Sequence, residues 1–376
     1  MRAQSPVLRT FRYPLHPNKA QETVLESWLA ACQRLYNGTL EHRREAWRKQ
    51  HISVTLYDQQ KELTELRAAD LEWAAIPVWV ERSAIRRVDH AFKAFFRRVK
   101  AGQTPGFPRF RSLDRYDTFD LGSSLPRIDD DRVNLPKLGQ VRFHKYRELR
   151  GAVRHVRVSR TSRGWSISFV CDLGDAPPKA AVRSAVGVDV GLEAFATLST
   201  GERVENPRFG REAQEVLARR QRSLARKRRG SNSRKETKRL VARAHERIRN
   251  QRTDFARKLA CLLFSRFDLV AHEDLQIARM VHGNLARSIY DAAWGQFLRC
   301  LALKAEEAGK HCIAVDPRGT SQACTACGAV ATKELSQREH PLRLRLHRAP
   351  RPQRGAERVG ARLARGAVDR SCKVEP

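Results

Sequence analysis

Two apolar segments of the β type, far apart in the chain, each place an acid at or just past their end. The first is residues 186–191, Val-Gly-Val-Asp-Val-Gly, and the second is residues 269–275, Leu-Val-Ala-His-Glu-Asp-Leu. Such short apolar runs predict buried strands, and glycines beside the first acid would let a phosphate or a metal approach closely. Hard divalent cations bind carboxylate oxygens. We therefore predict that Asp189 and Glu273 share one metal site, although either acid taken alone is more often a turn residue.

The net charge of the chain indicates which kind of substrate such a site would act on. The sequence has 73 Lys and Arg against 41 Asp and Glu, a formal net charge of +32. An excess of this size repels itself unless a polyanion is near, so nucleic acid is the expected partner, and a merely solvated basic surface is the alternative. Two metals held by acids can stabilise the attacking and the leaving oxygen of a phosphodiester. The combination favours a nuclease.

Membrane association is the other role open to a basic protein. No stretch approaches the roughly 18 apolar residues of a spanning helix, and the N-terminal sequence Met-Arg-Ala-Gln-Ser-Pro lacks the apolar core of a signal peptide. We therefore expect a cytoplasmic protein with no membrane partner. Five of the eight cysteines stand singly among apolar neighbours, as reduced core thiols do, and only Cys324 and Cys327 have the spacing of half a zinc site.

The first half of the chain changes from a helical to an alternating pattern. A strand is expected at residues 7–14, followed by helices, the first of which places Leu25, Trp28, Leu29, Cys32 and Tyr36 on one face. Short alternating runs over residues 118–172 indicate a small β-domain, which the first strand completes if the helices are an insertion. One helix repeats apolar residues at helical spacing, and we expect a core stripe there rather than a base-stacking surface. The stripe consists of Ile85, Val88, Phe92, Phe95, Phe96 and Val99.

The second half begins after a linker at Pro177 and Pro178. Strands are predicted around Val186, Phe195 and residues 203–205, then at Leu269 and residues 311–315, with a helix from about Trp294 to Ala308. Strands and helices in this order, with acids at strand ends, indicate an RNase H-like α/β core. The whole chain is therefore expected to be a multidomain α+β protein.

A very basic segment lies between the two acids. Residues 219–252 read as two helices broken at residues 230–233, with too few apolar residues to bury much surface. Their charge would follow phosphates rather than bases. The predicted nucleic-acid-binding residues are Arg219, Arg220, Arg226, Lys227, Arg228, Arg229, Lys235, Arg239, Arg247, Arg249 and Arg252.

Taken together, these motifs resemble the TnpB/OrfB family of transposon-encoded RNA-guided DNA nucleases, which are related to type V CRISPR effectors. The resemblance covers most of the chain. It rests on Tyr13-Pro14 with Cys32 and Tyr36-Asn37, Ala91-Phe92 with Phe95-Phe96, Gly106-Phe-Pro-Arg-Phe110, Gly187-Val-Asp-Val-Gly-Leu192, His245-Glu-Arg-Ile-Arg-Asn-Gln-Arg252 with Asp254-Phe255, Glu273-Asp-Leu275 and Thr320-Ser-Gln-Ala-Cys-Thr-Ala-Cys-Gly328.

The resemblance implies a domain plan and partners. It implies a β-barrel wedge domain at residues 1–16 and 116–178, a helical recognition domain at 17–115, and a RuvC-like nuclease domain at 183–318 whose basic helical hairpin spans 212–260. A partial zinc finger would occupy residues 319–340. Guide RNA and target double-stranded DNA are the implied partners, in a prokaryotic cytoplasm close to the nucleoid. Asp189 and Glu273 match the first two catalytic acids, with Mg²⁺ or Mn²⁺ as the implied ion.

The family pattern also requires a second cysteine pair and a third acid, and neither is found. The likeness stops at His340 and gives way to an Arg-rich tail, residues 341–376, which we expect to be disordered. Cys324 and Cys327 therefore form an incomplete Zn²⁺ site. His340, His347 and Cys372 are the other candidate ligands, but an unpatterned tail is not expected to place them in the fixed tetrahedron that zinc requires. Asp316 and Asp369 are poor substitutes for the third acid.

The abrupt break suggests a change of reading frame. If one base is skipped after His340, permitted codons for residues 341–366 can encode Cys-Gly-Cys-Gly followed by Asp-His-Asn-Ala-Ala-Arg-Asn, which restores the missing cysteines and acid in order. We hypothesise that the tail is an out-of-frame translation, either natural or from a sequencing error. The DNA around codon 340 in an independent isolate tests this hypothesis.

Loss of a catalytic group commonly lowers the rate by orders of magnitude. The expected function is therefore that of an RNA-guided DNA endonuclease, often labelled a transposase, with impaired cleavage. Two alternatives stay open: a nuclease-dead RNA-guided DNA-binding protein, and an RNA-binding protein that uses no guide.

Overall fold

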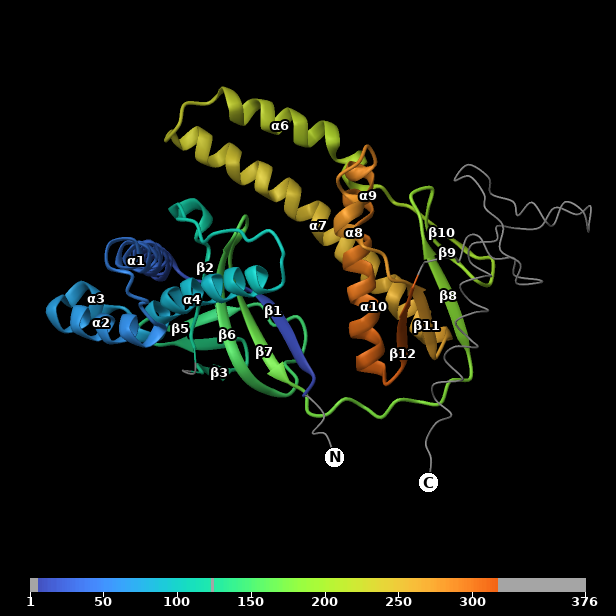
Figure 1. Ribbon diagram of the computed structural model, residues 1–376, viewed down its shortest axis with the longest axis horizontal. Helices are drawn as coiled ribbons and strands as arrows, with labels where there is room; N and C mark the ends of the chain where they lie inside the picture. Colours follow the sequence, from blue (N-terminus) through green and yellow to red (C-terminus); the bar gives the residue numbers. More distant parts are fainter. Residues whose placement is uncertain (1–5, 123–124, 317–376) are drawn as a thin grey trace, which may run out of the picture. The chain divides into compact units, whose positions relative to one another are not determined.

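The computed structural model of the 376-residue chain describes residues 6–122 and 125–316. The chain divides into two compact units, Met1–Asp175 and Ala176–Pro376, each of which combines a β-sheet with helices (Figure 1). The mixed α/β architecture expected from the sequence is thus confirmed.

The sheet of the first unit has seven antiparallel strands in the order β2-β6-β7-β1-β5-β4-β3. The N-terminal strand β1 lies near its middle and pairs with β7 from Leu8↔Asp172 to Leu15↔Trp165. The remaining strands all follow the helices of this unit in the sequence. The strands are β1 (Leu8–His16), β2 (Thr118–Asp120), β3 (Arg127–Asp129), β4 (Arg132–Leu135), β5 (Gly139–Phe143), β6 (Ala152–Thr161) and β7 (Gly164–Asp172).

This sheet differs from the barrel that the resemblance implied. Closure would require the outer strands β2 and β3 to pair, and no such pairing occurs among the described residues. Both strands are only three residues long. Because so short a strand can exchange few ladder hydrogen bonds, the two ends have little capacity to close the sheet. The structure therefore shows an open sheet in this unit.

Four helices and a short 3₁₀ turn complete the first unit. Asn18 and Gln21 form a capping box at the start of α1, and Thr55 and Asp58 form another at the start of α2, so the chain's own side chains satisfy the first backbone N–H groups. The predicted buried face of the first helix is confirmed and packs into a core with the sheet. The helices are α1 (Lys19–Gln50), α2 (Leu56–Ala69), α3 (Leu71–Ala75), α4 (Val78–Lys100) and η1 (Leu113–Arg115).

Helix α4 departs from the expected core stripe. Its first half buries Ile85 and Val88, but Phe96 is 57% exposed and Val99 is 49% exposed. Phe92 only borders the core. The stripe is thus apolar along its whole length, whereas only its N-terminal half is covered by other elements.

The second unit has a five-stranded mixed sheet in the order β10-β9-β8-β11-β12. Strand β11 pairs in parallel with both β8 and β12, whereas β9 pairs antiparallel with both β8 and β10. All five predicted strands are confirmed. They are β8 (Ala185–Val190), β9 (Ala194–Leu198), β10 (Arg203–Glu205), β11 (Leu269–Glu273) and β12 (His311–Val315).

Helices provide the crossovers between the parallel strands of this sheet. The chain leaves β10, forms a long helical hairpin and returns to β11, and a further helix leads to β12. Buried residues of α7 and α10 pack against β8, β9 and β11 to form the core. The helices are α5 (Phe209–Glu212), α6 (Gln214–Arg226), α7 (Asn232–Arg266), α8 (Ile277–Met280), α9 (Ala286–Ala292) and α10 (Trp294–Ala308). Among the described helices, none combines the length and apolarity needed to cross a membrane.

Candidate functional site

Asp189 and Glu273 lie side by side at the ends of neighbouring parallel strands. The pairing of β11 with β8 runs from Leu269↔Ala185 to His272↔Val188, so the next position in register joins Glu273 to Asp189. Residues level with each other on parallel strands point to the same face of the sheet. The structure thus brings together the two acids predicted from the sequence.

The two carboxylates also interact electrostatically. Asp189 is half-buried, and this desolvation, followed by the nearby charge of Glu273, raises the pKa of its carboxyl group to about 6. Both causes disfavour the charged form of Asp189. A bound cation would relieve them, because it replaces lost hydration and separates the two like charges. Hard carboxylate oxygens are the ligands that Mg²⁺ and Mn²⁺ take, so this pair fits such an ion.

The register that brings the acids together is anchored at the opposite ends of the strands. Asp268, just before β11, accepts hydrogen bonds of 3.2 Å from the backbone N–H groups of Arg183 and Ser184, just before β8. The bond from Arg183 and the one from Lys310 are the main causes that lower the pKa of Asp268. Because a slip of one residue would turn a side chain to the other face, this anchoring decides that both acids share one face.

Gly191 has a structural task in the turn that follows Asp189. The sequence suggested that glycines near Asp189 admit a phosphate or a metal. In the structure Gly191 begins the turn between β8 and β9, its backbone N–H donates to the Phe195 carbonyl, and a Cβ atom would lie 2.9 Å from the Ala194 carbonyl oxygen. This glycine therefore allows a tight hairpin that holds Asp189 in place.

Among the described residues, Asp189 and Glu273 do not belong to a larger cluster of metal-binding side chains. Within residues 6–122 and 125–316, no group of three or more His, Cys, Asp and Glu side chains could hold a metal ion. Asp316 directly follows β12, whose Val315 pairs with Glu273, but its side chain is exposed. Asp369, Cys324, Cys327, His340, His347 and Cys372 lie outside the described residues, as do the partial zinc finger and the Arg-rich tail.

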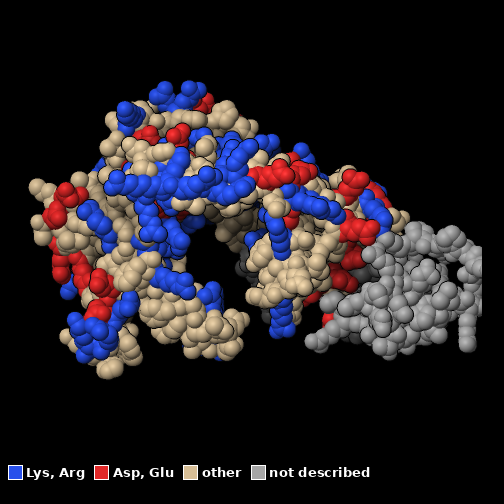
Figure 2. Space-filling model, turned by 90° about the horizontal axis from the view of Figure 1, so that it is seen from above, with Lys and Arg blue, Asp and Glu red and all other residues tan. Residues whose placement is uncertain are grey.

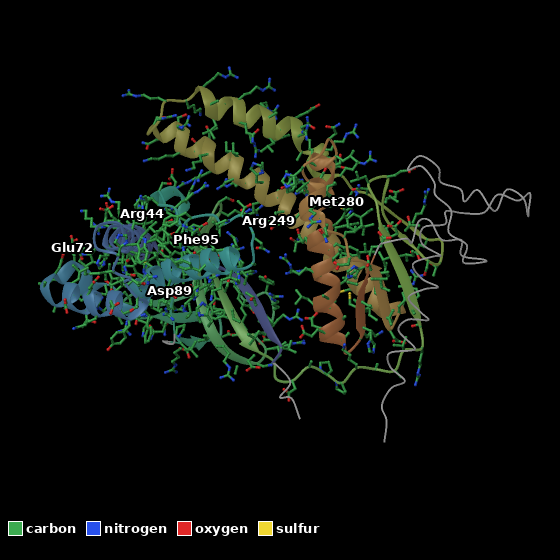
Figure 3. All side chains as sticks on the ribbon, viewed as in Figure 1. Arg44, Glu72, Asp89, Phe95, Arg249 and Met280 are labelled. Atoms are coloured by element: carbon green, nitrogen blue, oxygen red, sulfur yellow. The ribbon has the colours of Figure 1, made fainter. Side chains whose placement is uncertain are left out.

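The basic segment forms a helical hairpin of α6 and α7. Figure 2 shows Lys and Arg side chains gathered on the face seen from above, where this hairpin lies, and Figure 3 labels Arg249 on α7. Eight of the predicted contact residues are exposed to solvent. They are Arg219, Arg226, Arg228, Arg229, Lys235, Arg239, Arg247 and Arg249.

The other three predicted contact residues take part in the packing of the protein itself. Arg220 donates to the Leu240 carbonyl across the hairpin, and Lys227 donates to the Ser233 hydroxyl near its tip. Arg252 is partly buried in an ion pair with Asp291. These three cations are therefore structural at least in part, and the exposed eight are better placed to contact phosphates.

Asp291 on α9 is a residue that the sequence did not single out. Its Oδ1 atom accepts hydrogen bonds of 2.7 Å from Arg252 Nη2 and from the backbone N–H of Gly210, and its Oδ2 accepts one of 3.0 Å from the backbone N–H of Arg211. A Cβ atom at Gly210 would lie 2.7 Å from Asp291 Oδ1, so a larger residue there would displace this carboxylate from its present position. This carboxylate, which we call the Asp291 clamp, joins α5, α7 and α9 where the two arms of the hairpin begin.

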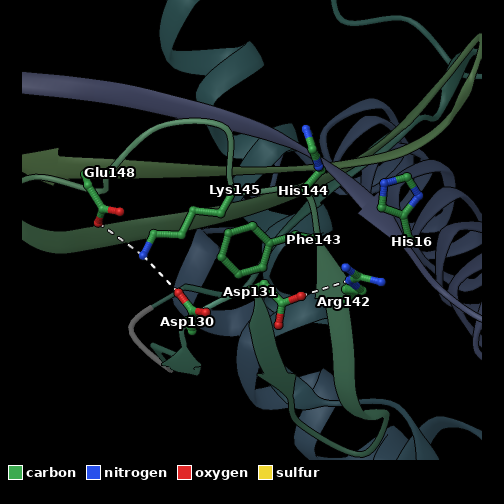
Figure 4. Close-up of a pocket in the computed structure, with 8 residues that line it drawn as sticks. All are labelled: His16, Asp130, Asp131, Arg142, Phe143, His144, Lys145 and Glu148. Carbon is green, nitrogen blue, oxygen red and sulfur yellow. Dashed lines mark hydrogen bonds and ion pairs between the residues drawn. The ribbon is translucent and has the colours of Figure 1, made fainter.

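A separate concave surface lies on the sheet of the first unit (Figure 4). It has a volume of about 540 Å³ and is lined by His16, Asp130, Asp131, Arg142, Phe143, His144, Lys145 and Glu148. Its charges are mutually paired: Arg142 with Asp131 at 2.8 Å, and Lys145 with both Asp130 and Glu148. Its three carboxylates and two cations are thus engaged with one another, so the surface offers a ligand no free patch of a single charge.

Comparison with known proteins identifies the family. The family model described as "Probable transposase" matches residues 168–283, which include both Asp189 and Glu273. A protein of Streptomyces pristinaespiralis named "Putative RNA-guided DNA endonuclease" is 30% identical over 339 residues, covering 87% of this chain and 82% of the relative. The chain belongs to the TnpB/OrfB family.

A second relative agrees with this membership. "Putative RNA-guided DNA endonuclease InsQ" of Escherichia coli (strain K12) is 29% identical over 386 residues, covering 97% of this chain and 94% of the relative. A model described as "Cas12f1-like, TNB domain" matches residues 294–355, so the likeness does not stop at His340 as expected from the sequence. A third, described as "Helix-turn-helix domain", matches residues 1–51, a range whose described part, residues 6–51, contains β1 and the long helix α1.

The fold of this family member resembles that of Cas12f1. The protein in the "Cryo-EM structure of the Cas12f1-sgRNA-target DNA complex" superposes with a TM-score of 0.55 at 12% sequence identity, covering 91% of this chain and 82% of that protein. At this identity the likeness concerns the fold alone.

Proposed function

We propose that this protein is an RNA-guided DNA-binding protein with a metal-dependent endonuclease site of reduced activity. The observation that carries the proposal is the position of Asp189 and Glu273, level on adjacent parallel strands and close enough for the charge of Glu273 to raise the pKa of Asp189. Both relatives are named as RNA-guided DNA endonucleases. Guide RNA and target double-stranded DNA are therefore the proposed partners.

Each unit has a proposed role. The second unit would be the RuvC-type nuclease with an RNase H-like core, because its parallel strands deliver both acids to one edge of the sheet. The exposed cations of α6 and α7 would lie along the phosphates of the paired guide and target. In the first unit, the sheet would serve as the wedge domain and α1–α4 as the recognition domain that reads a short DNA motif beside the target.

The Asp189 and Glu273 carboxylates would hold Mg²⁺ or Mn²⁺. When bound, such an ion activates a water molecule and stabilises charge on phosphate oxygens. Asp189 must be ionised to act as a ligand, so its raised pKa of about 6 makes binding weaken as the pH falls below 6. Zn²⁺ on Cys324 and Cys327 is proposed only for a chain with a complete cysteine set.

The reduced activity follows from the missing third acid. Two carboxylates alone would supply too few ligands to hold a second ion, whose charge would stabilise the leaving group. Removing one catalytic group of this kind costs a factor on the order of hundreds or more in rate. The protein is thus expected to select DNA by its guide and to cut it slowly.

The deciding experiment compares two forms of the full chain, each purified with its guide RNA. One form is the chain as it stands, and the matched control replaces residues 341–376 with the shifted-frame sequence that contains the cysteines and the acid. With Mg²⁺ and a guide-matched plasmid, both forms should bind the plasmid. The control should cut it at least about 100-fold faster than the chain as it stands. Asp189→Ala should abolish cutting by the control.

Three outcomes contradict the proposal. Equal cutting by the two forms would overturn the reduced activity, and cutting that survives Asp189→Ala would overturn the assigned site. Binding that shows no preference for DNA complementary to the co-purified RNA would instead favour the alternative of an RNA-binding protein without a guide, which the basic hairpin also suits.

A further inference from the structure

The exposed half of α4 and the loop that follows it carry an unusual set of aromatic rings. Phe95 lies 5.2 Å from Phe96 and 5.4 Å from Phe107, and Phe92 lies 5.7 Å from Phe107, measured between ring centroids. We call these four rings the aromatic platform; Figure 3 labels Phe95 on α4. Phe96 is 57% and Phe107 47% exposed, so the platform presents ring surface to solvent.

The charge around the platform has one sign. Between His90 and Leu113 the sequence contains six Lys and Arg residues and no Asp or Glu. Within the described part of the chain, Arg97, Arg98, Lys100 and Arg109 make no ion pair with an acid, and all four are exposed. An apolar surface ringed by unopposed cations suits a ligand that is flat and apolar at one end and anionic at the other.

The loop that carries Phe107 is tied to α1 just after this ring, through residues 109–111. The Arg111 carbonyl accepts hydrogen bonds from Gln33 and Asn37 of α1, and the Arg111 backbone N–H donates back to the Asn37 side chain. The Tyr36 hydroxyl donates to the Arg109 carbonyl, and the Arg44 guanidinium lies over the Phe110 ring at 5.3 Å. Rings fixed in advance lose little conformational entropy when a ligand stacks on them.

A groove opens beside the platform. It has a volume of about 520 Å³, shares Phe92 and Phe96 with the platform, and is bordered by Tyr57, which is 78% exposed. Its one acid, Asp89, is paired with Lys93 at 2.8 Å and with Arg43 at 3.5 Å. The groove therefore adds a further exposed ring without adding an unpaired negative charge.

We infer that the aromatic platform and this groove bind unpaired nucleotides by base stacking. Exposed rings interleaved with cations are the usual means of holding single strands, because every base offers a π face and every linkage a phosphate. Paired bases present no such face, so a duplex would gain only the phosphate contacts. The inference rests on the proposed function in that the guide RNA and the opened DNA target are its two possible sources of unpaired nucleotides.

The test uses substitutions that keep apolar volume but remove the aromatic face. The full chain without guide, as wild type, as Phe96→Leu/Phe107→Leu and as Phe96→Tyr/Phe107→Tyr, is titrated into 20-nucleotide DNA and RNA single strands that contain 2-aminopurine, and into the matching duplexes. The Leu variant should bind single strands about tenfold more weakly and lose the quenching of 2-aminopurine fluorescence. The Tyr variant should retain both, and duplex binding should change less than twofold.

The controls separate the possible failures. Tyr290→Leu removes an exposed ring of α9 and should change none of these values. A stronger effect with RNA assigns the platform to the guide and a stronger effect with DNA assigns it to the opened target, and both support the inference. Unchanged quenching in the Leu variant, or an equal loss of duplex binding, overturns it.

A changed oligomeric state with unchanged nucleic-acid binding would also overturn the inference, because the platform would then be a protein interface. No guide-directed cutting is measured, so failure of the proposed function would leave these results interpretable.

Discussion

Asp189 on β8 and Glu273 on β11 occupy level positions on adjacent parallel strands, and the charge of one raises the pKa of the other. This relationship is costly to the fold. A carboxyl group that is partly desolvated beside a like charge destabilises the folded state unless something binds there. Two predictions follow from this cost and concern stability and metal binding, and neither requires catalysis.

Asp189→Asn should stabilise the protein at neutral pH. The folded pKa of Asp189 is about 6 and the ordinary value is 3.8, so between these values the folded chain holds a proton that the unfolded chain has lost. Wild-type stability therefore falls as the pH rises from 4 to 6, by at most about 3 kcal/mol. Thermal melts should give the Asn variant a higher Tm at pH 7.5 and an equal Tm at pH 4. The same Tm difference at both pH values would exclude this cause.

Mn²⁺ should stabilise the wild-type protein at pH 7.5. An ion that binds only the folded state at 100 times its Kd adds about 2.7 kcal/mol to the free energy of unfolding. The rise in Tm should disappear in Glu273→Gln, which removes one ligand charge, and should shrink below pH 6, where Asp189 holds its proton. Electron paramagnetic resonance of free Mn²⁺ would report binding directly. An equal rise in Tm for Glu273→Gln would place the ion elsewhere.

Asp291→Ala should destabilise the second unit by about 2–4 kcal/mol, because it leaves the partly buried Arg252 charge and two backbone N–H groups without their acceptor. Urea unfolding measures this loss. Limited proteolysis should also cut near residues 208–214 earlier than in the wild type. A double-mutant cycle with Arg252→Met tests the coupling between the two residues, and additive effects would argue against the Asp291 clamp.

Replacing Arg239, Arg247 and Arg249 with Gln should lower the salt dependence of nucleic-acid binding. All three are exposed on α7, and each phosphate contact contributes about 0.7 to 0.9 to the slope of log affinity against log salt. The triple variant should lose about 2 units of slope with an unchanged Tm. Arg234→Gln is the matched control. Its guanidinium donates to the Leu224 and Lys227 carbonyls, so it should lower Tm more than it lowers the slope.

The sequence was a good guide to local structure because strands and helices follow from the spacing of neighbouring residues. The strand that carries Asp189 and the helix at Trp294–Ala308 were both predicted, and the two acids were paired before their register was known. The sequence did not reveal the roles of residues whose contacts lie far away in the chain. Asp291 reads as one more surface acid on a helix until Gly210 and Arg252 are placed against it.

The aromatic stripe of α4 shows the same limit. Periodicity reports which residues share a face, but it does not report where the covering surface ends, and here the cover ends between Val88 and Phe96. The alternating pattern also could not show whether the first sheet is open or closed. Alternation predicts strands, but it does not predict whether the two outermost strands pair.

Strand β12 is synthesised after the other two parallel strands of its sheet. Strand β11 is held between β8 and β12, and β12 comes last of the three in the chain. While a ribosome is still translating the codons before residue 311, the basic hairpin already exists as sequence, but β11 still has one uncovered edge. Because the contacts of Asp268 with Arg183 and Ser184 need no residue beyond β11, the two carboxylates can already be level at that stage, and β12 then covers the second edge of the strand that carries Glu273.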